Sequence, residues 1–99
     1  MKALFLDAAV VELDDAFEYY EYQQDGLGYR FVREVQNALH RITDYPLAWH
    51  KFSHNTRRCL VKNFPYGIIY QEQDKCTLLI VAIMNLHREP NYWANRIKK

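Results

Sequence analysis

Hydrophobic residues in the first half of the chain recur every three or four positions, which is the spacing of one face of a helix. The first such stripe consists of Ala9, Leu13, Ala16, Phe17 and Tyr20, and the second of Phe31, Val35, Ala38, Leu39 and Ile42. Asp7 is the expected N-cap of the first helix. Glycines in the stretch 25–28 end that helix, and Pro46 ends the second. Two amphipathic helices with so short a linker predict an antiparallel hairpin.

Most positions off the first stripe are acidic, and we expect them to form a solvated face. They are Glu12, Asp14, Asp15, Glu18 and Glu21. Elsewhere the pattern changes to that of strands. Residues 2–6 are short and apolar, residues 57–63 alternate so that Arg58, Leu60 and Lys62 share one face, and residues 67–72 form a third strand. The nearly continuous apolar run 76–84 predicts a central strand that is buried on both faces.

The connections between these strands are short, which favours an antiparallel meander. Residues 49–56 have mixed polarity and read as a loop with room for a short strand, and residues 90–99 have the length of one or two helical turns. The predicted fold is therefore α+β, in the order β-α-α-β-β-β. An N-terminal strand and a helical hairpin pack on an antiparallel sheet, and a short helical tail follows.

Composition limits the class of protein. The 99 residues suit one domain covering residues 1–99, with 49% hydrophobic residues and few glycines and prolines. No apolar run approaches a membrane span and the N-terminus does not resemble a signal peptide, so we expect a cytoplasmic protein without membrane contact. The two cysteines, Cys59 and Cys76, are too far apart for a paired zinc motif. We expect free buried thiols, no metal and no cofactor.

Charge is divided unevenly along the chain. Residues 1–44 hold four lysines and arginines against nine acidic residues, a net charge of −5, and residues 45–99 hold nine against three, a net charge of +6. A basic half can attract phosphate or an acidic protein although the whole chain is nearly neutral. An acidic helical hairpin and basic strands could equally serve solubility alone.

Several segments, in this order, resemble the RelE/ParE family of type II toxins. They are Tyr19-Tyr20-Glu21, Gly26-Leu27-Gly28, Phe31 with Glu34-Val35 and Ala38-Leu39, Arg57-Arg58, the run 64–70 (Phe-Pro-Tyr-Gly-Ile-Ile-Tyr) and the run 87–93 (His-Arg-Glu-Pro-Asn-Tyr-Trp). Together they cover nearly the whole chain. The resemblance implies a toxin that inhibits bacterial growth and a cognate antitoxin that neutralises it.

The resemblance implies one of two activities. RelE-like toxins enter the ribosomal A site and cut mRNA, whereas ParE-like toxins block DNA gyrase. The glycine-containing helix linker and the Phe-Pro-Tyr-Gly turn look more like the ParE branch. RelE-like nucleases commonly carry arginine after the tyrosine that opens the third strand, but here Gly67 follows Tyr66. We therefore favour a gyrase inhibitor, and a family member that binds its antitoxin without toxicity is a third alternative.

A metal-free nuclease would need a base, an acid and positive charge at the phosphate. His87 could be the base or acid, Arg88 could pair with phosphate, and Tyr92 could donate a proton. Arg58 and Lys62, with Arg88, could bind nucleic acid or another target. Each has a structural alternative: Arg88 could pair with Glu89 or an acid of the first helix, and Tyr92 and Trp93 could anchor the tail.

Overall fold

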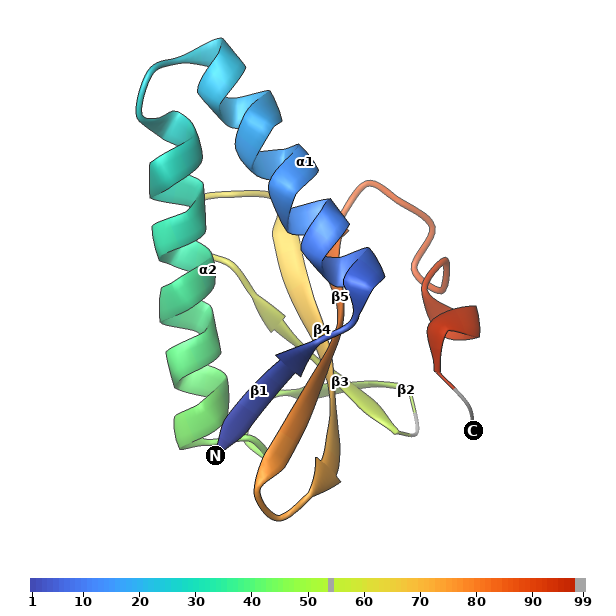
Figure 1. Ribbon diagram of the computed structural model, residues 1–99. Helices are drawn as coiled ribbons and strands as arrows, with labels where there is room; N and C mark the ends of the chain where they lie inside the picture. The colour runs from blue at the N-terminus through green and yellow to red at the C-terminus, as the bar shows by residue number, and fades with distance from the viewer. Residues whose placement is uncertain (54, 98–99) are drawn as a thin grey trace.

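The computed structural model describes residues 1–53 and 55–97, which form a five-stranded sheet with a helical hairpin on one face (Figure 1). The elements in chain order are β1 (Lys2–Phe5), α1 (Asp7–Gln23), α2 (Leu27–Asp44), β2 (His50–Ser53), β3 (Thr56–Leu60), β4 (Tyr66–Asp74), β5 (Thr77–Asn85) and the 3-10 helix η1 (Ala94–Arg96). The predicted α+β class and element order are confirmed, with β2 as an additional strand. None of the helices in the described residues has the length and hydropathy needed to span a membrane.

The strand order across the sheet is β1-β5-β4-β3-β2. The segments β3, β4 and β5 form the expected antiparallel meander. β1 pairs with β5 in parallel, and the helical hairpin separates β1 from the other strands in the sequence. β5 therefore lies between two strands, and neighbouring residues such as Ile80 and Val81, which point to opposite faces, are both fully buried.

The hairpin is held together at its tip by two glycines and one carboxylate. Gly26 has a φ of 87° and precedes α2, where a residue with a side chain would be strained. A Cβ on Gly28 would lie 2.6 Å from the carbonyl oxygen of Phe17, so only glycine lets the helices approach this closely. The Glu21 carboxylate accepts hydrogen bonds from the amides of Gly26 at 2.9 Å and Gly28 at 3.0 Å. Glu21 thus caps the start of α2, and placing it on a solvated face was wrong.

Three local predictions differ from the structure. Leu6, not Asp7, is the N-cap of α1, because the Leu6 carbonyl accepts the first helical bonds and Asp7 is already the first residue of the helix. β3 ends at Leu60, because the amide of Val61 bonds to the carbonyl of Tyr66 and closes a turn. Lys62 lies in that turn and does not share a strand face with Arg58.

Two predictions about the second half of the chain can be checked. The tail forms the three-residue η1, a single turn of 3-10 helix, which is the shorter of the predicted one or two turns. Cys59 is buried as expected, but Cys76 lies in the β4–β5 turn and is exposed. Both cysteines are free.

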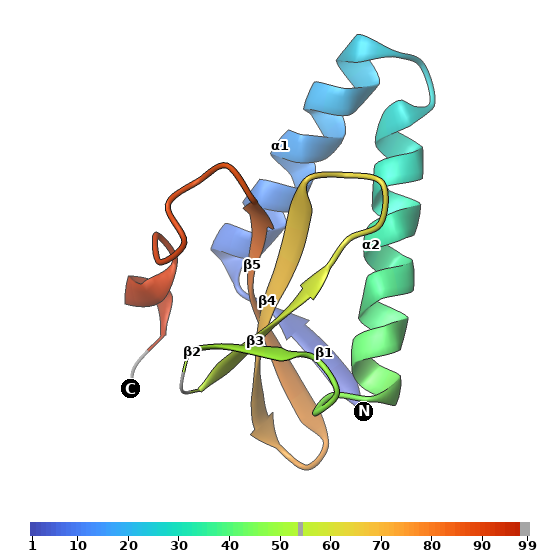
Figure 2. The same cartoon turned by 180° about the vertical axis from the view of Figure 1, so that it is seen from behind.

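The sheet is covered differently on its two faces. The helical side holds most of the core, including Phe31, Ile42 and Ile68. On the opposite face a smaller cluster contains Ile69, Val81, Ala82 and Met84, and it is closed by Trp93 from the tail. Figure 2 shows the tail returning beside β5 on the side away from α2. This return brings the tail back to the start of α1, where the candidate site lies.

Candidate functional site

The segment after β5 is fixed to the body of the protein by one tryptophan. Trp93 is 2% exposed and packs on the apolar face made by β4 and β5. Its indole nitrogen is buried and has no hydrogen-bond partner among the described residues. The prediction that Trp93 anchors the tail is confirmed. Burying a ring of this size holds the neighbouring residues of the tail close to α1.

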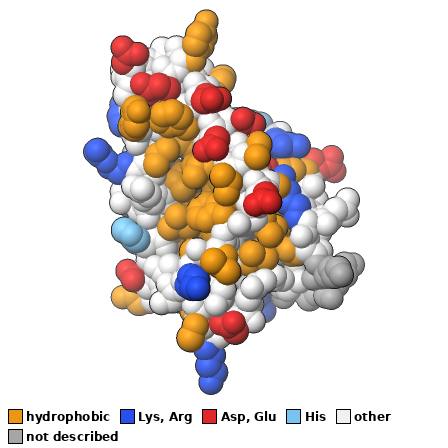
Figure 3. Space-filling model, viewed as in Figure 1, with side chains coloured by type: hydrophobic (Ala, Val, Ile, Leu, Met, Phe, Trp, Pro, Cys, Tyr) orange, Lys and Arg blue, Asp and Glu red, His pale blue; other side chains and the backbone are white. Residues whose placement is uncertain are grey.

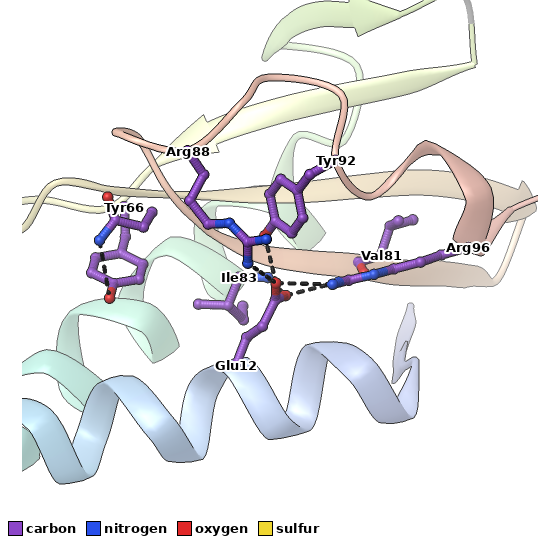
Figure 4. Close-up of polar contacts among 8 residues, drawn as sticks. Glu12, Tyr66, Val81, Ile83, Arg88, Tyr92 and Arg96 are labelled. Carbon is purple, nitrogen blue, oxygen red and sulfur yellow. Dashed lines mark hydrogen bonds and ion pairs between the residues drawn. The ribbon is translucent and has the colours of Figure 1, made fainter.

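Glu12 of α1 collects the polar contacts of the tail (Figure 4). Its carboxylate accepts hydrogen bonds from the Ile83 amide at 3.0 Å and from the Tyr92 hydroxyl at 2.5 Å. Arg96 donates to both oxygens, at 2.9 and 3.0 Å, and also to the Val81 carbonyl at 3.1 Å. One carboxylate thereby joins α1, β5 and the tail. We call Glu12, Ile83, Arg88, Tyr92 and Arg96 the Glu12 cluster.

Arg88 is the outermost member of the Glu12 cluster. Its Nη1 lies 4.0 Å from Glu12 Oε2, and its guanidinium stands 3.8 Å from the centre of the Tyr92 ring. Pairing of Arg88 with an acid of the first helix is therefore confirmed. The Arg88 side chain is nevertheless 55% exposed, so its remaining donors face solvent.

A cleft of about 250 Å³ opens between α1 and the ends of β4 and β5, next to this cluster. Tyr19, Tyr66 and Asn85 line it together with Arg88 and Tyr92. Burial raises the pKa of the Tyr66 hydroxyl. Burial and the hydrogen bond to Glu12 also raise the pKa of the Tyr92 hydroxyl above its usual range. Both phenols therefore keep their protons at neutral pH and are poor bases.

The structure brings only part of the predicted nuclease set together. Arg88 and Tyr92 meet at Glu12, where the Tyr92 hydroxyl already donates a hydrogen bond to the carboxylate. His87 is exposed in the turn after β5, and its amide donates to Asn85 Oδ1 at 2.9 Å. Within the described part of the chain, no hydrogen bond of the His87 side chain is found. His87, Arg88 and Tyr92 are thus close together in the sequence, but their side chains do not form one preorganised catalytic site.

Arg58 lies on β3 and takes the space beside Gly67. A Cβ on Gly67 would lie 3.1 Å from Cγ and Cδ of Arg58, so the aliphatic stem of Arg58 crosses the strand there. Its guanidinium stands 4.6 Å from the centre of the Phe52 ring. A larger residue at position 67 would have to displace this stem. Lys62 lies in the turn between β3 and β4 and therefore belongs to a different part of the surface.

Sequence reasoning missed Glu12 and Arg96 as site residues. Glu12 had been placed on the solvated face of the first helix, but its side chain is 15% exposed. A signal was present, because Glu12 follows Ala9 by three residues and precedes Ala16 by four, so it borders the buried stripe. Arg96 gave no comparable signal, since its partner is 84 residues away in the chain.

The chain was compared with known protein families and structures. Residues 3–91 match the model of the family described as "ParE toxin of type II toxin-antitoxin system, parDE". The chain belongs to the ParE toxin family. The matched segment includes Glu12 and Arg88 and ends before Tyr92, Trp93 and Arg96. The three residues that hold the tail of this ParE-family toxin against its body thus lie beyond the family match.

A solved structure supports the fold of this toxin. A chain of "Chromosomal ParDE TA system from P. aeruginosa" superposes with a TM-score of 0.73 over 88% of this chain and 97% of that chain. The sequence identity is 14%, so the likeness concerns the fold. No curated protein sequence matches the chain. The family match agrees with the resemblance found in the sequence, including its ParE branch.

Proposed function

We propose that this toxin inhibits bacterial growth by blocking DNA gyrase in the cytoplasm and that a cognate antitoxin neutralises it. The observation that carries the proposal is the match of residues 3–91 to the ParE toxin family. The proposed mode of action is binding to the enzyme, without chemistry on a nucleic acid. Arg88 is the residue we assign to target contact, because its guanidinium is held by Tyr92 and Glu12 and is still half exposed.

The contacts of the candidate nuclease residues support a binding inhibitor rather than an mRNA endonuclease. A general acid or base has to reach the proton that it transfers, but the Tyr92 hydroxyl is committed to Glu12. Glu12 also reduces the positive charge that Arg88 could offer to a phosphate. At position 67 the Arg58 stem fills the space that a further arginine would need.

Expression in a bacterium separates the two activities. We expect growth arrest with induction of a DNA-damage reporter and intact translated mRNA. Cleaved mRNA without DNA damage would replace the proposal by the RelE-like nuclease. Normal growth with folded chain present would support a family member that has lost toxicity. The His87→Ala variant is the matched control, because an inhibitor that binds gyrase does not need an imidazole for proton transfer and should stay toxic.

A hydrophobic patch between the two helices is the surface that we assign to the antitoxin. The helices diverge from their tip, and Figure 3 shows hydrophobic side chains gathered between α1, α2 and β1. We assign to this patch Val10 and Leu13 of α1, Val32 and Leu39 of α2, and Phe5 of β1, which are hydrophobic and exposed or half-buried. β1 is also an outer strand of the sheet, so its free edge can pair with an added strand.

Substitution of Val10 tests this surface. Val10 is 41% exposed, so Val10→Asp places a charge in the patch with little effect on the fold. We expect the affinity for the small protein encoded beside the toxin gene to fall at least about tenfold, which is about 1.4 kcal/mol. Val11→Asp, on the outermost side of the same helix, is the matched control. Equal loss in both variants would place the antitoxin elsewhere.

A further inference from the structure

Three arginines form a row on the outer side of α2. Arg30, Arg33 and Arg41 lie within about 80° of the helix circumference and span about 16 Å along its axis, given 3.6 residues per turn and a rise of 1.5 Å. Asn37 lies between them on the same side. The side turns away from the buried residues of α2, such as Phe31 and Ile42. Arg30 and Arg33 are exposed to solvent on it, and Arg41 is half-buried.

Lys62 extends this row from the neighbouring β3–β4 turn. Arg41 Nη2 donates to the Leu60 carbonyl at 3.3 Å, and Asn63 Nδ2 donates to Glu34 Oε2 at 3.3 Å. These two contacts fix the turn alongside α2, where Figure 2 shows the connection between β3 and β4 beside the helix. Lys62 lies between Leu60 and Asn63 in the sequence and is exposed. We call Arg30, Arg33, Arg41 and Lys62 the α2 ridge.

Few charges of the protein itself oppose the α2 ridge. Within residues 1–53 and 55–97, the ion pairs found both involve Glu12, which lies on the other helix. Glu34 is on the flank of the ridge and accepts a hydrogen bond from Asn63. Asp44 is the last residue of α2, beyond Arg41. The middle of the ridge consequently presents cationic and amide donors.

The composition of the α2 ridge fits a phosphate backbone better than a protein surface. Protein interfaces are anchored by buried aromatic or aliphatic side chains, and none of the four ridge residues supplies one. Single-stranded nucleic acids are bound by bases stacking on aromatic rings. The nearest exposed aromatic residue, Tyr29, has its ring edge-on to Phe17 at 5.0 Å, and Tyr45, which is also exposed, follows the last turn of α2. A row of arginines with no aromatic residue among them is suited to the rigid backbone of a duplex.

We propose that the α2 ridge binds the phosphodiester backbone of duplex DNA. This goes beyond the proposed function, because it gives the toxin a contact to DNA in addition to its contact with a protein target. The ridge is on α2, whereas Arg88 and the Glu12 cluster lie between α1 and the tail. The contact reads no bases, so binding is independent of sequence and decreases steeply with salt.

The test measures binding of the purified full-length chain to a fluorescent duplex of about 20 base pairs by fluorescence anisotropy. The salt concentration is varied from about 50 to about 200 mM. The double variant Arg30→Gln/Arg33→Gln removes two ridge charges. We expect its affinity at the lowest salt to fall at least about tenfold, and the slope of log K against log salt to become shallower by about 1.8. The control, Lys51→Gln/Lys75→Gln, removes two exposed charges from β2 and the β4–β5 turn and should bind like the unmodified chain.

Four results would overturn the proposal. They are absence of binding to the duplex at the lowest salt, unchanged binding by the ridge variant, equal loss in the control variant, and tighter binding to single-stranded RNA or polyglutamate of the same charge. The last result would assign the α2 ridge to RNA or to an acidic protein. Thermal unfolding of both variants verifies that they are folded. Inhibition of gyrase is measured separately, so either property can fail alone.

Discussion

Glu12→Gln is the substitution that tests the Glu12 cluster most sharply. The glutamine keeps one oxygen, which can accept a hydrogen bond from Ile83 or Tyr92. Its NH2 group, however, is a donor and cannot accept a hydrogen bond from the Arg96 guanidinium. The bidentate pair at 2.9 and 3.0 Å is thereby lost. A hydrogen bond to a charged group contributes about 1.5–3 kcal/mol, and the side chains of Glu12 and Arg96 are only 15% and 21% exposed. We expect a loss of about 2 kcal/mol, after some discount for solvent screening.

Two measurements report this loss. If the tail unfolds together with the rest, the melting temperature should fall by about 8–16 °C for a domain of this length. If the tail detaches alone, the emission of Trp93 should move to longer wavelength in a Trp49→Phe background. Glu18→Gln makes the same chemical change at an exposed position of α1 and should alter stability by less than about 0.5 kcal/mol. An unchanged melting temperature and unchanged Trp93 emission in Glu12→Gln would refute the assigned role.

Gly28→Ala should destabilise the protein by about 1–3 kcal/mol in urea unfolding, because its Cβ would meet the Phe17 backbone. Gly67→Ala should cost less than Gly28→Ala, because the opposing Arg58 stem can move, and the reverse order would contradict the packing described. Folding raises the pKa of Tyr92. The stability that this shift contributes is therefore complete below about pH 10, the pKa of tyrosine in the unfolded chain, and is lost as the pH rises above that value. Tyr92→Phe should therefore lose less stability than the unmodified chain between about pH 9 and 11, and parallel profiles would count against this.

The elements that could be predicted from the sequence are those with a clear local period. The stripes of α1 and α2 and the apolar run of β5 each carry their own signal, and the structure places all three as expected. β2 was ambiguous because His50–Ser53 is a short outer strand that pairs with β3, and its residues are exposed or half-buried. The parallel pairing of β1 with β5 joins segments about 75 residues apart, and no local pattern encodes such a contact.

The candidate site was predictable only in its tail residues. Arg88, Tyr92 and Trp93 lie close together in sequence, and the anchoring role of Trp93 followed from its size. Glu12 was hidden because acidic residues surround it on α1, and burial of one of them is decided by what the tail places opposite. Lys62 was misplaced because period two was extended past Leu60, where β3 ends, into the turn that contains Asn63 with its positive φ.

Supercoiling of relaxed plasmid DNA by purified gyrase, with the purified toxin added, tests the central claim most directly. We expect the toxin to stop supercoiling in proportion to its concentration, and the protein encoded beside its gene to restore it. In parallel, translating ribosomes with added toxin should keep their mRNA intact. Supercoiling that proceeds unchanged at a large excess of folded toxin, together with cleaved mRNA on the ribosomes, would contradict the account.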